Sequence, residues 1–342
     1  MARSPGWGAK QGEIMGYKSV SIIGAGSMGT ALSILLSKNG HKVKLWSVFP
    51  DEIDMINEAR EQVEKLPGVR IPETVFCTAD IEEALRDAHV VALAIPSQAR
   101  RLNAKTISRY VSGGMVVACF SKGLEESTGL RLSEVILQEM PGITYVAFSG
   151  PCHAEELAVG IPTAYVAASG NEQAAEYAQD IFMSPVFRVY TNRDIIGVEL
   201  GGALKNVIAL CAGISDGLGY GDNTKAALIT RGIAEITRLG VALGASPQTF
   251  AGLAGIGDLV VTCTSMHSRN RRAGILIGKG KPVNEAINEV KMVVEGITTT
   301  RAAYNLAKRE NITMPITFEA YDVLFNGKNP RDAVNDLMTR DK

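Results

Sequence analysis

The chain has 342 residues, of which 46% are hydrophobic and 21% are charged, so it is a globular chain long enough for about two domains. Lys and Arg number 35 against 36 Asp and Glu, and a formal net charge of −1 argues against nucleic-acid partners and an anionic membrane surface. The five cysteines and four histidines are scattered, which argues against a metal site or a disulfide framework and favours the reducing cytoplasm.

We expect no secretory signal in the first 16 residues. Residues 1–16 are Gly-rich and polar and lack the apolar stretch of a secretory signal, so we interpret them as a disordered leader. No run approaches the roughly 18 apolar residues that a membrane helix needs, so we expect no membrane insertion.

Residues 17–192 alternate short β-branched runs with helical patterns. The predicted strands are Val20–Ile23, Val43–Trp46, Val75–Cys77, Val90–Ile95, Met115–Phe120, Thr144–Phe148 and Thr163–Ala168. The predicted helices between them are Ala31–Lys38, Asp51–Glu64 and Asp80–Arg86. Near-continuous apolar strands separated by helices indicate an α/β domain with a largely parallel sheet that is covered on both faces.

Residues 193–342 form a second predicted domain that is nearly all helical, because β-branched runs largely cease after Asn192. The predicted helices are Ile195–Ile214, Lys225–Leu243, Ser246–Leu253, Asn270–Ile277, Val283–Val290, Thr298–Lys308, Thr317–Leu324 and Asn329–Met338.

A glycine motif directly follows the first predicted strand and opens a helix. In Gly24-Ala25-Gly26-Ser27-Met28-Gly29, Gly24 suits a tight turn, Gly26 a close approach to a pyrophosphate, and Gly29 close helix–sheet packing. A turn that merely needs glycine is the alternative. Strand, glycines and helix stand in the order of a βαβ unit, which favours a Rossmann-like domain that binds a dinucleotide.

The choice between NAD and NADP depends on the residues after the second strand. An acid there would hold a ribose hydroxyl and an Arg would hold a 2′-phosphate, but the sequence reads Ser47-Val48-Phe49. Asp51 lies too far on. We therefore predict that both cofactors are used, with a preference for NADPH weaker than about tenfold.

Lys205 is the candidate catalytic residue. It lies with Asn206 inside a long apolar helix, after Gly201-Gly202, which we expect to leave room for a small substrate. Burial lowers the pKa of an amine toward values that suit a general acid or base. The alternative is a lysine whose stem packs while its amine reaches water.

Several polar residues outside that helix are candidate ligands. Ser268-Arg269-Asn270 precedes an apolar helical run and could bind a phosphate, although a solvated basic turn fits equally well. Asp258 suits either a helix N-cap or a group that orients the lysine or a substrate hydroxyl. Lys122 and the stretch Ser149-Gly150-Pro151 each follow a strand end, where ligands of such sheets bind.

With these motifs, the chain from Ser19 to its last helix resembles the bacterial-type NAD(P)-dependent glycerol-3-phosphate dehydrogenases. The most specific stretch is Gly202-Ala203-Leu204-Lys205-Asn206, continuing to Asp216-Gly217. The glycine motif, Ser121-Lys122-Gly123, Ser149-Gly150-Pro151, Gly257-Asp258-Leu259, Ser268-Arg269-Asn270 and Val293-Val294-Glu295 recur in the order of that family.

The resemblance implies specific roles. Lys205 would accept the proton of the C2 hydroxyl of glycerol 3-phosphate. Substrate contacts would be Lys122, Gly150, Cys152, Lys205, Asp258, Ser268, Arg269 and Asn270. Cofactor contacts would be Gly24, Gly26, Ser27, Met28, Gly29, Val48, Lys122, Ala154, Arg269, Val293 and Glu295. The resemblance also implies a homodimer, a cytoplasmic location and a place in phospholipid synthesis.

Three residues depart from the family pattern. Cys152 stands where Ser or Thr is usual, which replaces a hydroxyl donor by a weaker thiol. Val48 stands where a basic residue is frequent, and Cys211 replaces a smaller residue, which we interpret as a change in packing.

Two other functions remain open on the sequence. A β-hydroxyacid dehydrogenase also joins a dinucleotide-binding domain to a helical domain with a lysine. A non-catalytic dinucleotide sensor would keep the glycine motif, but it would not need Lys205 together with Ser268-Arg269-Asn270.

Overall fold

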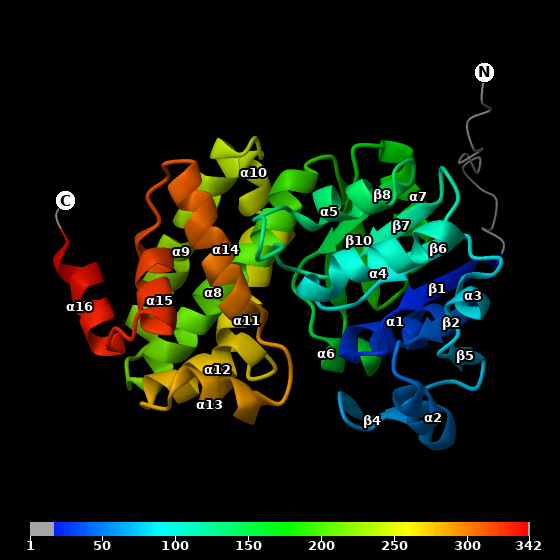
Figure 1. Cartoon of the computed structure of the whole chain (residues 1–342), viewed down its shortest axis with the longest axis horizontal. Coiled ribbons are helices and arrows are strands. Elements are labelled where there is room, and N and C mark those ends of the chain that lie inside the picture. The colour runs from blue at the N-terminus through cyan, green and yellow to red at the C-terminus, as the bar shows by residue number, and fades with distance from the viewer. Residues whose placement is uncertain (1–16, 341–342) are drawn as a thin grey trace. The chain divides into compact units, whose positions relative to one another are not determined.

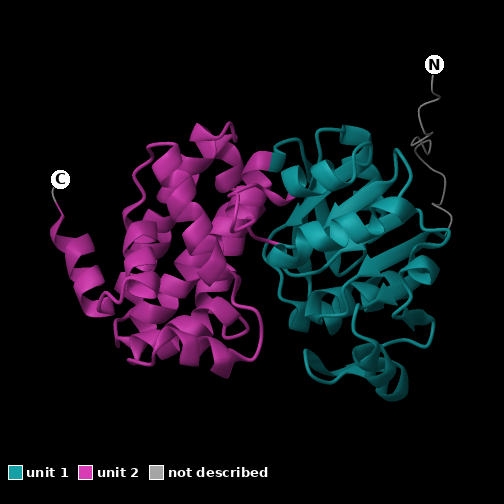
Figure 2. Ribbon diagram, viewed as in Figure 1, with its two compact units in different colours: residues 1–121, 133–195 teal, residues 122–132, 196–342 magenta. Residues whose placement is uncertain are grey.

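The structure, a computed structural model, describes residues 17–340 and divides into two compact units (Figure 2). Of the described residues, unit 1 contains 17–121 and Ser133–Ile195, and unit 2 contains Lys122–Leu132 and 196–340. The segment Lys122–Leu132 therefore belongs with the helices, and its Leu124 is buried in their core. The predicted leader, residues 1–16, lies outside the described residues.

Unit 1 is built on an eight-stranded sheet in the order β10-β9-β8-β7-β6-β1-β2-β5 (Figure 1). Its strands are β1 (Ser19–Ile23), β2 (Lys42–Trp46), β5 (Val75–Thr78), β6 (Val90–Leu93), β7 (Val116–Cys119), β8 (Thr144–Ser149), β9 (Thr163–Ala168) and β10 (Phe187–Asn192). Neighbouring strands run parallel except β8 and β9, which are antiparallel. β1, β6 and β7 are buried along their whole length, which confirms the predicted sheet with both faces covered.

The helices of unit 1 connect these strands. They are α1 (Ser27–Lys38), α2 (Pro50–Ala59), α3 (Ile81–Leu85), α4 (Arg100–Ile107), α5 (Leu132–Glu139), α6 (Ala154–Ala158) and α7 (Glu172–Phe182), with short 3-10 turns at Ser97–Ala99 and Ser108–Tyr110. β10 was not among the predicted strands. It is one of the two edge strands, so only alternate residues such as Phe187 and Val189 are buried and its apolar signal is weak.

The predicted helix Asp51–Glu64 is wrong in its second half. α2 ends at Ala59, where Arg60 adopts a left-handed conformation with φ of 50°. The following residues form a small hairpin of β3 (Glu61–Gln62) and β4 (Leu66–Arg70). The buried Gln62 side chain donates to the Ala25 carbonyl in the glycine motif, a tertiary contact that helical periodicity does not reveal.

Unit 2 is helical throughout its described elements, as predicted. Its helices are α8 (Ile195–Gly217), α9 (Asp222–Ala242), α10 (Pro247–Phe250), α11 (Asp258–Thr264), α12 (Arg269–Gly278), α13 (Val283–Val290), α14 (Glu295–Arg309), α15 (Pro315–Phe325) and α16 (Pro330–Thr339). α11 was not predicted, and a π-helical turn, η3 (Leu253–Gly257), leads into it. Such turns occur often at functional sites.

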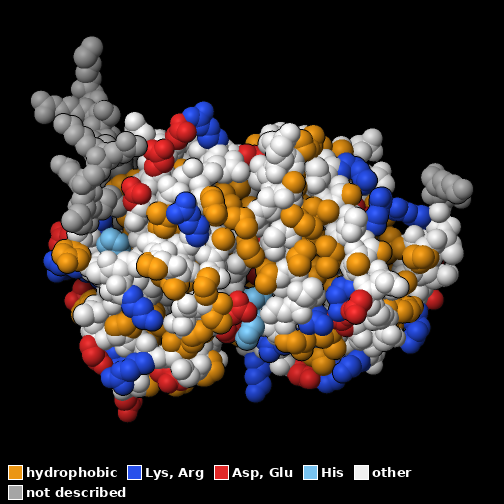
Figure 3. All heavy atoms as spheres, turned by 180° about the vertical axis from the view of Figure 1, so that it is seen from behind, with side chains coloured by type: hydrophobic (Ala, Val, Ile, Leu, Met, Phe, Trp, Pro, Cys, Tyr) orange, Lys and Arg blue, Asp and Glu red, His pale blue; other side chains and the backbone are white. Residues whose placement is uncertain are grey.

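The prediction that no segment is long and apolar enough to cross a membrane is wrong for α8. One 18-residue window of this helix meets the length and hydropathy criteria, but 83% of the window is buried inside the structure. It is therefore the central core helix of unit 2. On the face shown in Figure 3, basic and acidic side chains are interspersed, in keeping with the net charge near zero.

Candidate active site

The glycine motif has the geometry that its sequence predicts. Gly24 has φ of +114°, and a Cβ there would lie 2.8 Å from the Ala94 carbonyl oxygen. A Cβ on Gly29 would lie 1.8 Å from the Gly24 carbonyl oxygen, so this glycine is needed for packing of α1 against the loop. A Cβ on Gly26 would meet nothing within 4 Å, which leaves open space above the start of α1.

That open space suits an anion. Gly26 is the N-cap of α1, and the first turn of the helix carries no acidic residue, so the partial positive charge of the helix end is uncompensated. Ser27 begins the helix and donates its hydroxyl hydrogen to the Lys65 carbonyl at 2.6 Å, while Met28 packs against the core of unit 1. The loop thus fits the pyrophosphate of a dinucleotide on its own geometry.

The other candidates in unit 1 lie near strand ends. Val48 follows β2 and is 58% exposed. Gly150 follows β8 with φ of +148°, which requires glycine, and a Cβ there would lie 3.0 Å from the Ala164 carbonyl oxygen. Cys152 is half-buried against the core, and the buried Ala154 begins α6, which packs on α1.

In unit 2 the structure brings two lysines onto one carboxylate. The Lys205 Nζ lies 2.6 Å from Asp258 Oδ1, and the Lys122 Nζ lies 2.6 Å from Asp258 Oδ2. Lys205 is 6% exposed and Asp258 is fully buried. Gly257 is the N-cap of α11, and Asp258 is the first residue of the helix, with its side chain bridging the two lysines.

Burial and the neighbouring charges shift the pKa values of Lys205 and Asp258. Burial lowers the pKa of Lys205 to about 8; Asp258 opposes this shift and the nearby Lys122 adds to it. Burial alone would raise the pKa of Asp258, but the two lysines outweigh it and hold the pKa below its usual value. The cluster therefore carries a net positive charge while Lys205 is protonated, and Lys205 can lose its proton near neutral pH.

Thr262 completes this cluster and was not among the predicted site residues. The Lys205 Nζ donates to Thr262 Oγ1 at 2.6 Å, and Thr262 in turn donates to the Asp258 carbonyl oxygen at 2.6 Å. Thr262 is four residues after Asp258 on α11, so the only sequence signal was a polar residue one helical turn beyond the acid.

Gly201, one turn before Lys205, does not leave the space that the sequence led us to expect. A Cβ on Gly201 would lie 2.4 Å from the Ala254 carbonyl oxygen, so the space beside this glycine is filled by the backbone of η3. Gly201 therefore allows α8 to pack against the turn that presents Asp258, and it does not leave room for a substrate.

Ser268 and Asn270, two of the predicted phosphate ligands, have hydrogen-bond partners within the protein. The Ser268 hydroxyl caps α12 by accepting from the Arg271 N–H at 3.2 Å. The Asn270 amide donates to the Asn206 side chain at 3.0 Å and its oxygen accepts from the Gly296 N–H at 2.8 Å, which ties α12 to α8 and α14. Arg269 begins α12 and is half-buried.

The remaining predicted cofactor contacts lie at the start of α14. Val293 is 47% exposed and Glu295 is the first residue of the helix. Within residues 17–340, no group of three or more His, Cys, Asp or Glu side chains is placed to hold a metal ion.

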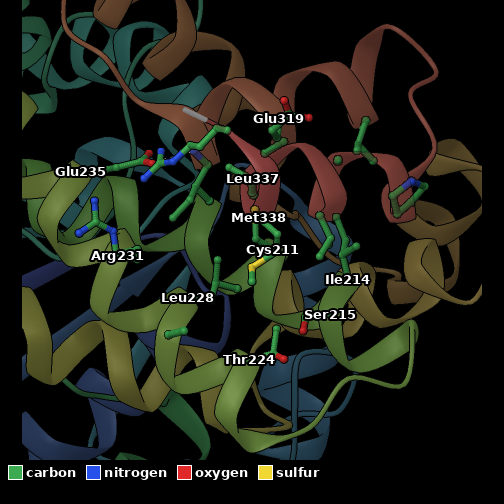
Figure 4. Close-up of a pocket in the computed structure, with 18 residues that line it drawn as sticks. Cys211, Ile214, Ser215, Thr224, Leu228, Arg231, Glu235, Glu319, Leu337 and Met338 are labelled. Atoms are coloured by element: carbon green, nitrogen blue, oxygen red, sulfur yellow. Dashed lines mark hydrogen bonds between the residues drawn. The ribbon is translucent and has the colours of Figure 1, made fainter. Parts of the chain in front are cut away.

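A separate cavity in unit 2 contains none of the predicted site residues. It encloses about 170 Å³ and lies between α8, α9, α15 and α16. Figure 4 shows Cys211 and Ser215 of α8 among its lining residues. Cys211 is thus a packing residue at the wall of this cavity, in keeping with its interpretation from the sequence.

Comparisons with known proteins point to one family. Residues 19–175 match the family model of the NAD-dependent glycerol-3-phosphate dehydrogenase N-terminus, and residues 194–335 match that of its C-terminus. Glycerol-3-phosphate dehydrogenase (NAD(P)+) of Desulfitobacterium hafniense strain Y51 is 55% identical over 323 residues, which cover 94% of this chain and 92% of that protein. The protein of the same name from Agathobacter rectalis is 51% identical over 323 residues, which cover 94% and 96%.

A solved structure shows the same likeness in three dimensions. The crystal structure of glycerol-3-phosphate dehydrogenase from Coxiella burnetii superposes with a TM-score of 0.92 at 37% identity. The match covers 95% of this chain and 99% of that one, so it includes both units.

Proposed function

The chain belongs to the NAD-dependent glycerol-3-phosphate dehydrogenase family, and we propose that Lys205 exchanges the proton in the reversible reduction of dihydroxyacetone phosphate to sn-glycerol 3-phosphate. The observation that carries this proposal is the buried amine of Lys205, with a pKa of about 8 and held by Asp258 and Thr262. A group that titrates near working pH can both donate and accept a proton efficiently.

The enzyme is an NAD(P)-dependent oxidoreductase that acts on a CH–OH group. The glycine motif is the proposed pyrophosphate site, because Gly26 leaves open space at an uncompensated helix start. The other proposed cofactor contacts are Gly24, Ser27, Met28, Gly29, Val48, Lys122, Ala154, Arg269, Val293 and Glu295. When bound, the nicotinamide supplies the hydride to the ketone carbon or accepts it in the reverse direction.

The residues of unit 2 then transfer the proton and stabilise the negative charge that develops on the substrate oxygen. In the reductive direction the Lys205 ammonium donates a proton to the oxygen on C2, and the net positive charge of the two lysines with Asp258 stabilises the developing alkoxide. In the oxidative direction the neutral amine accepts the hydroxyl proton. Thr262 and Asp258 hold the Lys205 Nζ in one position for both steps.

The substrate phosphate is assigned to the start of α12. The first turn of this helix has no acidic residue, and Arg269 adds a permanent positive charge there. The full proposed set of substrate contacts is Lys122, Gly150, Cys152, Lys205, Asp258, Ser268, Arg269 and Asn270.

The direct test is Lys205→Ala. We expect kcat to fall by at least about 10²-fold, because proton transfer is lost, while the affinity for NADH measured by fluorescence stays unchanged. Lys205→Arg should be equally poor, since a guanidinium does not release its proton. Lys225→Ala is the matched control, because it removes an ammonium paired with Asp216 at 2.9 Å and should retain activity. A near-normal kcat in Lys205→Ala contradicts the proposal.

The pKa of Lys205 also predicts opposite pH profiles for the two directions. Oxidation of glycerol 3-phosphate should rise as pH increases through about 8, because the neutral amine is the base. Reduction of dihydroxyacetone phosphate should fall over the same range, because the ammonium is the acid. Initial rates from pH 6 to 10 check this, and parallel profiles in both directions would remove Lys205 from the proton transfer.

The same pKa has a consequence for stability. The folded-state pKa of about 8 lies below the ordinary 10.5, so between these values the unfolded chain binds more protons at this site. The contribution of Lys205 to the free energy of unfolding therefore rises with pH from about 8 to about 10.5. In Lys205→Ala this contribution should be absent, which urea denaturation at several pH values measures.

The proposal also covers the cellular location, the oligomeric state and the metabolic role of the enzyme. We assign the enzyme to the cytoplasm, to a homodimer and to the supply of glycerol 3-phosphate for phospholipid synthesis, as the family resemblance implies. Analytical ultracentrifugation of the full chain tests the dimer. Turnover of dihydroxyacetone phosphate against 3-hydroxy acids separates this function from a β-hydroxyacid dehydrogenase, and cofactor binding without turnover of either would indicate a sensor.

A further inference from the structure

The end of β2 holds a carboxylate that the sequence pattern did not reveal. Dinucleotide-binding folds place an acid at this strand end to bind the ribose 2′-hydroxyl, and here the position is occupied by Ser47. The Ser47 hydroxyl donates to Glu52 Oε2, from the first turn of α2. The carboxylate of Glu52 therefore lies next to the position where the acid is missing.

Glu52 is held in place by two further donors from the β3–β4 hairpin. The Gln62 side chain donates to Glu52 Oε1 at 2.7 Å and to the Ala25 carbonyl at 2.8 Å, and Lys65 forms an ion pair with the same Oε1. The Glu52 side chain is only 9% exposed. The hairpin packs on α2 near the end of the sheet (Figure 1). This network joins the carboxylate to the glycine motif itself.

The charge balance of this network bears on cofactor choice. The only cation in it is Lys65, whose side chain is 35% exposed and whose charge is offset by Glu52. A carboxylate has about four acceptor positions, and the three donors leave one for a ribose hydroxyl. A 2′-phosphate, with close to two negative charges, would instead meet a carboxylate and a neutralised lysine.

We propose that Glu52 replaces the missing strand-end acid and that its carboxylate, which also offsets the charge of Lys65, makes the protein bind NADH more tightly than NADPH. The proposal rests on the proposed function only in requiring that a dinucleotide binds to unit 1. It sharpens the expectation of dual use, because it names the residue that sets the preference and reverses its direction.

The test is a fluorescence titration of the full-length protein with NADH and with NADPH, without substrate. In the wild type we expect the lower Kd for NADH. In Glu52→Gln the amide keeps the shape of the side chain but frees the charge of Lys65, so the ratio of the NADPH Kd to the NADH Kd should fall by about tenfold. Lys65→Met should raise that ratio, because the carboxylate then stands without a counter-charge.

The matched control is Asp51→Asn, which removes the same charge from an exposed neighbouring position in α2. It should leave the ratio within about twofold of wild type. If Asp51→Asn shifts the ratio as much as Glu52→Gln does, the effect comes from the overall negative charge at the start of α2 and not from the position of Glu52. A wild type that binds NADPH more tightly, or a folded Glu52→Gln with an unchanged ratio, overturns the proposal.

Two measurements keep the test independent of folding and of catalysis. If Glu52→Gln loses its thermal transition, Lys65→Met decides alone, since its partly exposed side chain is dispensable for the core and its predicted shift has the opposite sign. Because only binding is measured, an enzyme that fails to turn over dihydroxyacetone phosphate would refute the proposed function and leave this inference testable.

Discussion

The two candidate sites are built in opposite ways. The glycine motif of unit 1 depends on the lack of side chains. Backbone atoms fill the positions that a Cβ on Gly24 or Gly29 would occupy, and open space lies beside Gly26. The cluster of unit 2 works through buried charges, with Lys122 and Lys205 on the two oxygens of Asp258. The first lies within six consecutive residues, while the second combines three distant segments. Substitutions that add a side chain should therefore disturb the glycine motif most, and substitutions that remove a charge should disturb the cluster of unit 2 most.

The largest effect is expected from removing the shared carboxylate. Asp258→Asn removes the carboxylate that two largely buried lysine amines share and so breaks both ion pairs, and we expect a loss of about 3–5 kcal/mol in the free energy of unfolding. The pKa of Lys205 should fall further, because Asp258 is the main group that raises it. Urea denaturation measures the first effect and the pH profile of oxidation the second.

A double variant tests whether the loss of stability in Asp258→Asn comes from repulsion between the two amines or from disturbed packing. The double variant Lys122→Met with Asp258→Asn also removes one of the two amines that repel each other once the shared carboxylate is neutral, so it should recover part of the lost stability. A loss under about 1 kcal/mol in Asp258→Asn, or no recovery in the double variant, would show that the ion pairs do not stabilise unit 2.

The glycine motif offers a matched pair of variants with opposite readouts. Gly29→Ala should destabilise the protein by about 1–3 kcal/mol, because its Cβ collides with the Gly24 carbonyl. Gly26→Ala should change stability by less than about 0.5 kcal/mol, because its Cβ meets open space, yet it should weaken NADH binding at least tenfold, or roughly 1.4 kcal/mol. Calorimetry and fluorescence titration measure the two effects, and wild-type affinity in Gly26→Ala would show that the pyrophosphate does not approach there.

The smallest effect concerns a hydroxyl of α8 outside the cluster. The Ser215 Oγ is buried at the cavity of Figure 4 and has no hydrogen-bond partner among residues 17–340. Ser215→Ala should therefore stabilise the protein by about 1 kcal/mol or less and leave turnover unchanged. Thr262→Val, which removes a hydroxyl bound to Lys205, should reduce kcat instead. A marked loss of stability in Ser215→Ala would indicate a hydrogen bond to buried water.

Local sequence determined the parts of the fold that depend on neighbouring residues. The alternation of apolar strands and helices predicts the parallel sheet of unit 1, and the helical periodicity after Asn192 predicts unit 2. The glycine motif also follows from local sequence, because turn, N-cap and packing contact all fall within one short segment, in which Gly24 has a positive φ and a Cβ on Gly29 would collide with the Gly24 carbonyl. Resemblance over the whole chain pointed to the family that the comparisons show.

Tertiary structure alone decided how distant residues meet. Helical periodicity ran through Glu64, but contacts of Gln62 with Glu52 and Ala25 favour a hairpin there. The sharing of Asp258 by two lysines and the contact of Thr262 with Lys205 depend on helix packing, as does the closeness of Gly201 to Ala254. The physical reason is that burial and charge pairing are properties of a residue's surroundings in space, and a single sequence specifies those surroundings only through the packed fold.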